Sequence, residues 1–282
     1  MMNHKYDFFG VVSVKNANPN GDPLNGNRPR INYNGIGEIS DVCLKRKIRN
    51  RLMDSGENIF VQSDDYKNDE YTSLRDRADK SLDKKSFRDK NKLTQEACSN
   101  WYDVRAFGQL FAFKGGEAKG VSVGIRGPVS IHSAFSVDPI NISTIQITKS
   151  VNSEGDGSSK GSDTMGSKHR VDFGIYTFAG SINPQLAVKT GFTDEDAEKL
   201  KNSIQKMFEN DASSARPDGS MEVLKLYWWK HDNPGGQYSS AKVHRSIEIS
   251  KKEGVVEPRS IDDYQIKVTP LENLETEIYE GY

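Results

Sequence analysis

The sequence has few cysteines, no long apolar run and no large excess of either charge. Its two cysteines, Cys43 and Cys98, lie far apart among 282 residues without the spacing of metal ligands. We therefore expect a reduced, cytoplasmic protein with no metal and no cofactor. No apolar run is long enough to cross a bilayer, and the opening MMNHKYDFFG lacks the apolar stretch of a secretion signal. The composition gives no reason to expect a membrane partner.

The formal net charge of -1 excludes a chain that is strongly basic overall. The charges are unevenly distributed, however. Residues 1–60 hold nine Lys or Arg against six Asp or Glu, whereas residues 251–282 hold four against eight. Five of the nine cations fall between Lys45 and Arg51. A polyanion responds to this local field, so a basic face is compatible with a neutral total.

The stretch NANPNGDPLNGNRPR, residues 16–30, contains five Asn, three Pro and two Gly. Proline removes backbone donors, and Asn and Gly favour turns, so this stretch predicts neither a helix nor a central strand. It follows the apolar run YDFFGVVSV and carries Arg28 and Arg30 at its end. Gly21 and Gly26 allow another backbone to approach closely. We expect a rigid, amide-rich loop with a cationic tip.

The remaining pattern predicts an α+β fold. Apolar spacing and capping residues predict helices at about 40–54 and 193–209. Residues 55–100 are mixed in charge and predict an exposed insertion. Alternating or β-branched runs predict strands at about 6–14, 104–113, 121–131, 142–148, 171–182, 223–229, 242–249 and 264–268. This order favours two βαβ-like halves around one antiparallel sheet, a ferredoxin-like, RNA-recognition-type core with long insertions.

Three patterns that could indicate catalysis or ligand binding lack the required context. Ser122 lies in a G-x-S-x-G match, but Pro128 follows, so no nucleophile elbow is predicted. The run GSDTMGSK at residues 161–168 places Ser before Lys and precedes a strand, unlike a phosphate-binding loop. The five histidines show no paired spacing, although His169 and His231 each lie beside a lysine, which suits phosphate better than a metal.

The strongest binding signal joins the loop at residues 16–30 to the helix at 40–54. Lys45, Arg46 and Arg49 lie away from the apolar stripe of that helix, and the N-cap Ser40 begins it with amide donors that could receive a phosphate. The loop adds cations for phosphates and amides for bases and 2′-hydroxyls. The alternative is a merely solvated amphipathic helix. The candidate RNA-binding residues of this region are Asn18, Asn20, Arg28, Arg30, Ser40, Lys45, Arg46 and Arg49.

The Gly- and Ser-rich residues 151–170 contain two large apolar residues, Val151 and Met165. Such a composition predicts a projection from the core. Met165, Lys168 and His169 near its tip are candidates to touch a partner or to wedge between bases. The alternative is a disordered loop without a ligand.

Several blocks of the sequence, in this order, resemble the backbone subunit of type I CRISPR surveillance (Cascade) complexes, with subtype I-C the most similar. The resemblance covers the chain to about residue 250. The blocks are NPNGDPLNGNRPR, GEISDVCLKRKIRNRL, DVRAFGQL, GPVSIHSAFS, KHRVDFGIYTFAGSIN, KTGFTDEDAEKL and SSARPDGSM.

This resemblance implies a ferredoxin-like palm (residues 1–54, 103–147 and 173–270), helical fingers (55–102), a protruding thumb hairpin (148–172) and, after the palm, an acidic tail (271–282). It implies a non-catalytic subunit that oligomerises as a helical filament along the CRISPR guide RNA and presents it to target DNA. Its partners would be further copies of itself, the guide-end subunit and the large subunit. Ser40, Lys45, Arg46 and Arg49 match the RNA-backbone helix of the family, and Met165 is a candidate wedge.

Related type III subunits cleave RNA with a loop aspartate, so the alternative function is a metal-dependent ribonuclease that uses Asp22. Asp22 lies between Gly21 and Pro23, has no neighbouring acid for a metal, and is expected to cap its own turn. The strand VDFGIYTF also lacks the aromatic order of the RNA-recognition motif, so base stacking on the sheet is not predicted.

Overall fold

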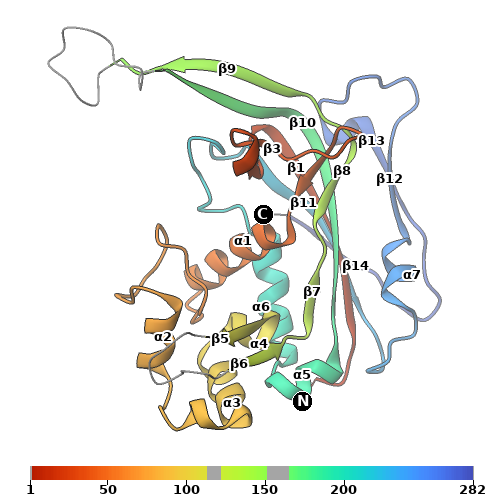
Figure 1. Ribbon diagram of the computed structural model, residues 1–282. Coiled ribbons are helices and arrows are strands. Elements are labelled where there is room, and N and C mark those ends of the chain that lie inside the picture. Colours follow the sequence, from red (N-terminus) through yellow and green to blue (C-terminus); the bar gives the residue numbers. More distant parts are fainter. Residues whose placement is uncertain (1, 113–121, 151–164, 282) are drawn as a thin grey trace, which may run out of the picture.

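The structure, a computed structural model, describes residues 2–112, 122–150 and 165–281. Within these residues the chain forms a mixed α+β fold around a large antiparallel sheet of order β14-β11-β1-β10-β8-β4, with β7 and β9 also pairing with β10 (Figure 1). The strands of this sheet are β1 (Tyr6–Ala17), β4 (Ile36–Ile39), β7 (Val129–Ile131), β8 (Ala134–Pro139), β9 (Ile142–Thr148), β10 (Met165–Ile182), β11 (Met221–Lys230) and β14 (Glu277–Glu280).

The centre of the sheet is the long pairing of β1 with β10, from Tyr6 opposite Ile182 to Ala17 opposite Val171. Both strands are rich in β-branched and aromatic residues, which suit a pleated sheet buried on both faces. Gly180 lies opposite Phe8, and a Cβ atom there would come within 2.1 Å of the Phe8 ring. The glycine therefore makes room for a large aromatic side chain in the core.

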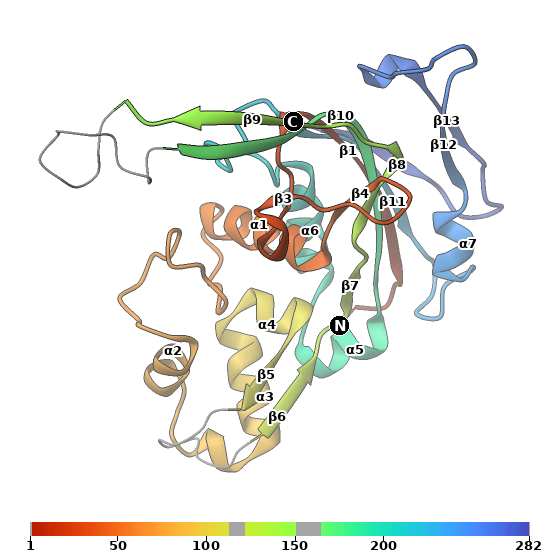
Figure 2. The same cartoon turned by 45° about the horizontal axis from the view of Figure 1, so that its top comes forward.

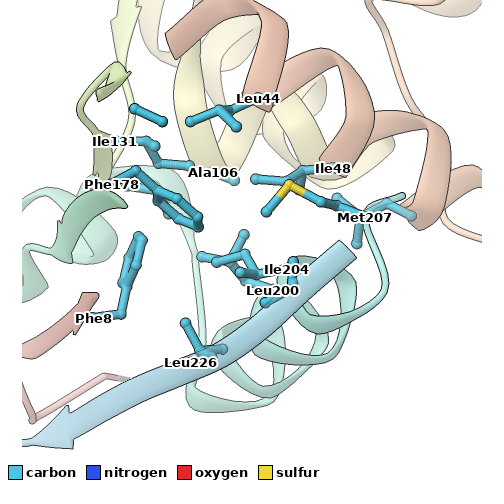
Figure 3. Packing of buried hydrophobic residues seen from close by; sticks show 14 of the residues in the cluster. Phe8, Leu44, Ile48, Ala106, Ile131, Phe178, Leu200, Ile204, Met207 and Leu226 are labelled. Atoms are coloured by element: carbon cyan, nitrogen blue, oxygen red, sulfur yellow. The ribbon is translucent and has the colours of Figure 1, made fainter. Parts of the chain in front are cut away.

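Helices α1 (Asp41–Asp54) and α6 (Asp194–Gln205) cover one face of the sheet. Leu44 and Ile48 of α1 meet Leu200 and Ile204 of α6 above the sheet residue Phe8 (Figure 3). The predicted helices at 40–54 and 193–209 are confirmed, although α6 ends earlier than expected. The apolar residues of each helix recur at helical spacing, so one side of each helix packs into the core.

A third layer covers the opposite face of the sheet. It contains α7 (Ser240–His244) and the hairpin of β12 (Ile247–Lys251) with β13 (Tyr264–Val268), which lie on the far side of the sheet from α1 (Figure 1). The predicted strand at 242–249 is therefore wrong in its first half. The side chain of Ser239 accepts a hydrogen bond from the amide of Lys242 and starts a helix there.

A buried polar cluster lies between this third layer and β1. His231 is fully buried and its Nε2 lies 2.8 Å from Oδ2 of Asp7, so it does not face solvent as a phosphate-binding residue would. Lys5 and His244 lie beside the same carboxylate. Burial alone would raise the pKa of Asp7, but hydrogen bonds from His231, His244 and Lys5 hold it well below its ordinary value.

The insertion after α1 forms its own small core. Its elements are α2 (Leu74–Ser81), α3 (Lys90–Asn100), α4 (Tyr102–Phe107), β5 (Gly108–Ala112) and β6 (Ser122–Arg126). The predicted strand at 104–113 is wrong in its first half, because α4 continues to Phe107 and Gly108 ends it at φ +81°. Phe111, Val123 and Ile125 pack in this core, so the insertion extends beyond the predicted boundary at residue 102.

Strands β9 and β10 continue beyond the sheet as a two-stranded ribbon that projects from the body (Figures 1 and 2). The predicted projection is thus strand from Met165 onward, while residues 151–164 lie outside the described residues. The acidic end of the chain is not a free tail, because β14 pairs with β11. Among the residues that the structure describes, no helix has the length and apolar character needed to cross a membrane.

Candidate nucleic-acid interface

The amide-rich loop is built as short strands added to the edge of the sheet. Strand β2 (Gly21–Asp22) pairs with β3 (Arg28–Pro29), and the amide of Glu38 donates to the carbonyl of Arg30 at 2.9 Å. Strand β4 then pairs with β8. The turns between them require left-handed backbone, which Gly26 and Asn27 adopt at φ 58°. The predicted turn-rich loop is present, with a 3-10 turn at Pro23–Asn25, and it lies at the root of the projecting ribbon (Figure 2).

Asn18 and Asn20 organise this loop from within. Asn18 is 3% exposed, and its amide nitrogen donates to the carbonyl of Asn27 at 2.7 Å. Oδ1 of Asn20 accepts hydrogen bonds from the amide (3.0 Å) and the hydroxyl (2.9 Å) of Ser40. These contacts hold the loop against the start of α1. Asn18 does not lie at the surface, contrary to the expectation that it faces RNA.

The start of α1 is closed by the chain itself. The Ser40 hydroxyl accepts from the amide of Cys43 at 3.3 Å, and the amide of Asp41 donates to the hydroxyl of Ser133 at 3.3 Å. The N-cap is as predicted, but the amides expected to receive a phosphate already have protein partners. Ser40 therefore acts on the loop through Asn20, and the expected open anion site is not present at these residues.

The five cations of α1 also have protein partners. Lys45 pairs with Asp41, Arg46 donates to the carbonyl of Val61, Lys47 pairs with Asp211, Arg49 pairs with Asp103, and Arg51 pairs with Asp54 and Glu209. The basic side of the helix is thus paired within the chain, and the contact of Lys45, Arg46 and Arg49 with RNA stays a prediction. Four of the five cations join α1 to other parts of the chain: the insertion and the loop that follows α6.

The pairs of Arg49 and Lys45 differ in burial. Asp103 is 1% exposed, and its carboxylate accepts from Nε of Arg49 at 2.8 Å and from the amides of Phe60 and Val61 at 2.7 and 3.1 Å. These contacts of Asp103 hold the chain in place where it leaves α1 for the insertion. Lys45 and Asp41 form a surface pair one helical turn apart, which stabilises little and can exchange for another anion.

Burial and charge shift two further groups on α1. Burial lowers the pKa of the Arg46 guanidinium, with the neighbouring charge of Arg49 adding to the effect. The hydrogen bond from Lys45 lowers the pKa of Asp41. Both shifts therefore have their causes within the chain.

The two cations of the loop are in a different situation. Arg28 is exposed, and its side chain makes no ion pair or hydrogen bond within the described parts of the chain. Nη2 of Arg30 lies 3.7 Å from Asp22, a weak contact, and its buried Nε has no hydrogen-bond partner among the described residues. The unpaired guanidinium of Arg28 and the exposed part of the weakly paired Arg30 are suited to a polyanion.

Asp22 caps its own turn, as predicted. Its Oδ1 accepts from the amide of Leu24 at 3.2 Å, and the nearest charge is Arg30. Within residues 2–112, 122–150 and 165–281, no three His, Cys, Asp or Glu side chains gather as metal ligands. The geometry at Asp22 thus offers a turn-capping role and gives no support to metal-dependent cleavage.

The ribbon carries the other predicted residues. Met165 is 61% exposed opposite Thr148, Lys168 is half-buried opposite Ile145, and the His169 ring lies 3.0 Å from the Thr144 hydroxyl. The apolar Ile145 and Ile147, at 41% and 49% exposure, were not predicted as exposed. Side chains alternate between the faces of a ribbon, so Met165 and Ile147 lie on opposite faces.

These features define an α+β protein with an open cationic loop at the root of a projecting two-stranded ribbon. A sequence model of the family described as CRISPR-associated protein Cas7 matches residues 4–269, and the chain belongs to this family. The Cas7 protein of Haloferax volcanii is 26% identical over 283 residues, which cover 95% of this chain and 82% of that protein.

The chain was also compared with solved structures. A chain of a structure titled "CRISPR RNA-guided surveillance complex, pre-nicking" superposes with a TM-score of 0.51 over 85% of this chain and 79% of that chain, at 15% identity. A chain of another, titled "CRISPR RNA-guided surveillance complex", gives 0.47 over 89% and 78%, at 16% identity. At this identity the first superposition shows that the fold is shared.

Proposed function

We propose that this Cas7 protein is the non-catalytic backbone subunit of a type I surveillance complex, and that it oligomerises along a CRISPR guide RNA. The observation that carries the proposal is the loop of a Cas7 chain that presents Arg28 and Arg30 without adequate counter-charges. A guide must be held whatever its sequence, and contacts to phosphates and 2′-hydroxyls meet that need.

The proposal extends to the parts of the molecule. Strands β1, β8, β10 and β11 with helices α1 and α6 have the order of a ferredoxin-like sheet and form the palm. The insertion of α2 to β6 forms the fingers, and the ribbon of β9 and β10 belongs to the thumb. Copies associate head to tail, which generates a helical filament rather than a closed ring.

The partners follow from the same assignment. They are the guide RNA, target DNA paired with that guide, further copies of this chain, and the guide-end and large subunits of the complex. The assignment to subtype I-C rests on the resemblance of the loop and helix blocks, and a cytoplasmic location rests on the composition.

The structure changes which residues we propose as RNA contacts. Arg28, Arg30 and the exchangeable Lys45 contact phosphates, and Lys168, His169 and Met165 contact the guide from the ribbon. Asn18, Asn20 and Ser40 position the loop. Arg46 and Arg49 hold the entry to the fingers and contribute to RNA binding through that position.

A binding experiment tests the proposal. The purified chain is titrated with single-stranded RNAs of unrelated sequence at several salt concentrations. We expect similar affinities and a linear fall of log K with log salt, of about 0.7 for each phosphate contact. Addition of Mg²⁺ should leave the RNA intact, and light scattering should show growth on longer RNA. Affinity no higher than that of an acidic control protein, or cleavage abolished by Asp22→Ala, would overturn the proposal.

A further inference from the structure

The turn between β3 and β4 presents an aromatic ring to solvent. Tyr33 is 109% exposed, whereas Phe135, the next most exposed aromatic residue in the described part of the chain, reaches 44%. The other large aromatic side chains of the described residues are half-buried or buried. A tyrosine that contacts nothing in its own fold gains no stability from packing, so its ring is available for a ligand.

The turn that carries Tyr33 is rigid. Oδ1 of Asn32 accepts hydrogen bonds from the amides of Asn34 at 2.9 Å and Ile36 at 3.1 Å. The backbone adds bonds from Asn32 to Ile36 and from Gly35 to Asn32, and Gly35 takes the left-handed φ of 76° that the turn requires. The ring is thus held on a defined support, which reduces the entropy lost when a ligand binds.

The surroundings of Tyr33 indicate the chemistry of that ligand. Arg30 lies three residues before Tyr33, where the chain leaves β3 and enters the turn, and its carbonyl accepts from the amide of Glu38. The carbonyl of Gly35 accepts from the amide of Ile140, so the turn also lies beside the root of the ribbon. A cation for a phosphate and a ring for a base, on one rigid segment, form a single-strand nucleic-acid site.

A protein partner is the alternative occupant of the turn. Leu24 and Ile31 are also exposed, and Ile31 lies two residues before Tyr33. The cations Arg28 and Arg30 of the same loop favour a polyanion over an apolar protein surface.

We propose that Tyr33 stacks on an unpaired base of the guide RNA, next to the phosphate held by Arg30. The inference rests on the proposed RNA-binding function. It adds a base contact on a turn outside the sheet, because the strand pattern of the sheet gives no aromatic platform. Stacking of this kind tolerates any base, because every base has a π-face.

The test compares Tyr33→Ala, Tyr33→Phe and Leu24→Ala in the full chain. Leu24 is 98% exposed on the same loop and has no ring, which makes it a matched control. The probe is single-stranded RNA with 2-aminopurine at successive positions, read by anisotropy and by fluorescence quenching. We expect Tyr33→Ala to weaken binding by about 5- to 150-fold and to reduce the quenching, with Tyr33→Phe and Leu24→Ala close to the parent.

The outcomes separate this inference from the function on which it rests. No RNA binding by the parent protein would overturn both. Binding by the parent that Tyr33→Ala leaves unchanged in affinity and quenching would overturn the stacking alone. An equal loss in Leu24→Ala, or weaker self-association of Tyr33→Ala without RNA, would show that the ring docks on protein instead of on a base.

Discussion

The cations of helix α1 are paired within the protein, whereas those of the loop at residues 18–34 are largely unpaired. The helix has five cations within seven positions, and the chain itself supplies a partner to each. The loop has Arg28 and Arg30, of which one lacks a partner among the described residues and the other has a weak one. The density of cations along a sequence therefore does not measure the charge available to a ligand, since folding brings distant carboxylates to some cations and leaves others exposed.

The difference also separates stability from binding. Four cations of α1 join the helix to the insertion and to the loop after α6, so their removal acts first on the fold. The cations of the loop make few contacts within the protein, so their removal acts first on ligand affinity. Three variants test this contrast.

The largest effect is expected for Asp103→Asn. The change leaves Arg49 in a site where its charge is no longer compensated, and removal of one partner of a buried pair costs about 3–5 kcal/mol. Urea unfolding should therefore show a much lower midpoint. RNA affinity should fall only under conditions that also unfold the protein. An unchanged midpoint would mean that this carboxylate does not stabilise the contact between α1 and the insertion.

An intermediate effect, on binding and not on stability, is expected for Arg28→Ala combined with Arg30→Ala. Both side chains are at least partly exposed, so the free energy of unfolding should stay within about 0.5 kcal/mol of that of the parent. The slope of log K against log salt should fall by about 1.4, at 0.7 for each lost phosphate contact. Lys189→Ala, an exposed cation on α5 (Pro184–Thr190), serves as the control. Equal slopes in all three proteins would place the guide elsewhere.

The smallest effect is expected for Asp41→Asn, which frees Lys45. The hydrogen bond from Lys45 lowers the pKa of Asp41 in the folded state below the unfolded value of about 3.9. This pair therefore stabilises the fold above that pH, and the contribution is lost as the pH falls through the lowered folded pKa. Its size is about 0.3–0.5 kcal/mol, as for other exposed helical pairs.

The parent and Asp41→Asn should accordingly differ slightly at pH 7 and converge in acid. RNA should bind the variant more tightly, because Lys45 no longer has to exchange its partner. Thermal unfolding at several pH values measures the difference in stability. RNA titration at neutral pH measures the difference in affinity. A loss of RNA affinity in Asp41→Asn would show that Lys45 does not face the guide.

Local signals were enough for the elements whose structure depends on near neighbours. The apolar spacing of Leu44 and Ile48 predicted α1, and Thr193 with Asp196 predicted the start of α6 with its capping box. The Asn- and Pro-rich loop was also predicted, because turn residues act on their own backbone. The segments at 104–113 and 242–249 were predicted wrongly, since short apolar runs fit a helix or a strand equally well.

The candidate site was predicted in composition but not in arrangement. Arg28 and Arg30 could be identified as exposed cations because proline and glycine keep their loop out of the core. The role of Arg49 could not be predicted, since its partner Asp103 lies 54 residues away along the chain. Tyr33 gave no signal in the sequence, where an aromatic residue is more often part of the core, and its exposure became evident in the folded chain.

The sequence alone determined the two helices of the palm, the turn-rich loop, the polar projection and the family, because these depend on residue order over short distances or on blocks of matching residues. The tertiary structure decided which charges remain available. Electrostatic pairing and burial depend on distance in space, which the sequence does not contain, and a carboxylate within hydrogen-bonding distance converts a ligand-binding cation into a structural one. The same argument explains why the less basic loop, and not the basic helix, presents the open part of this surface.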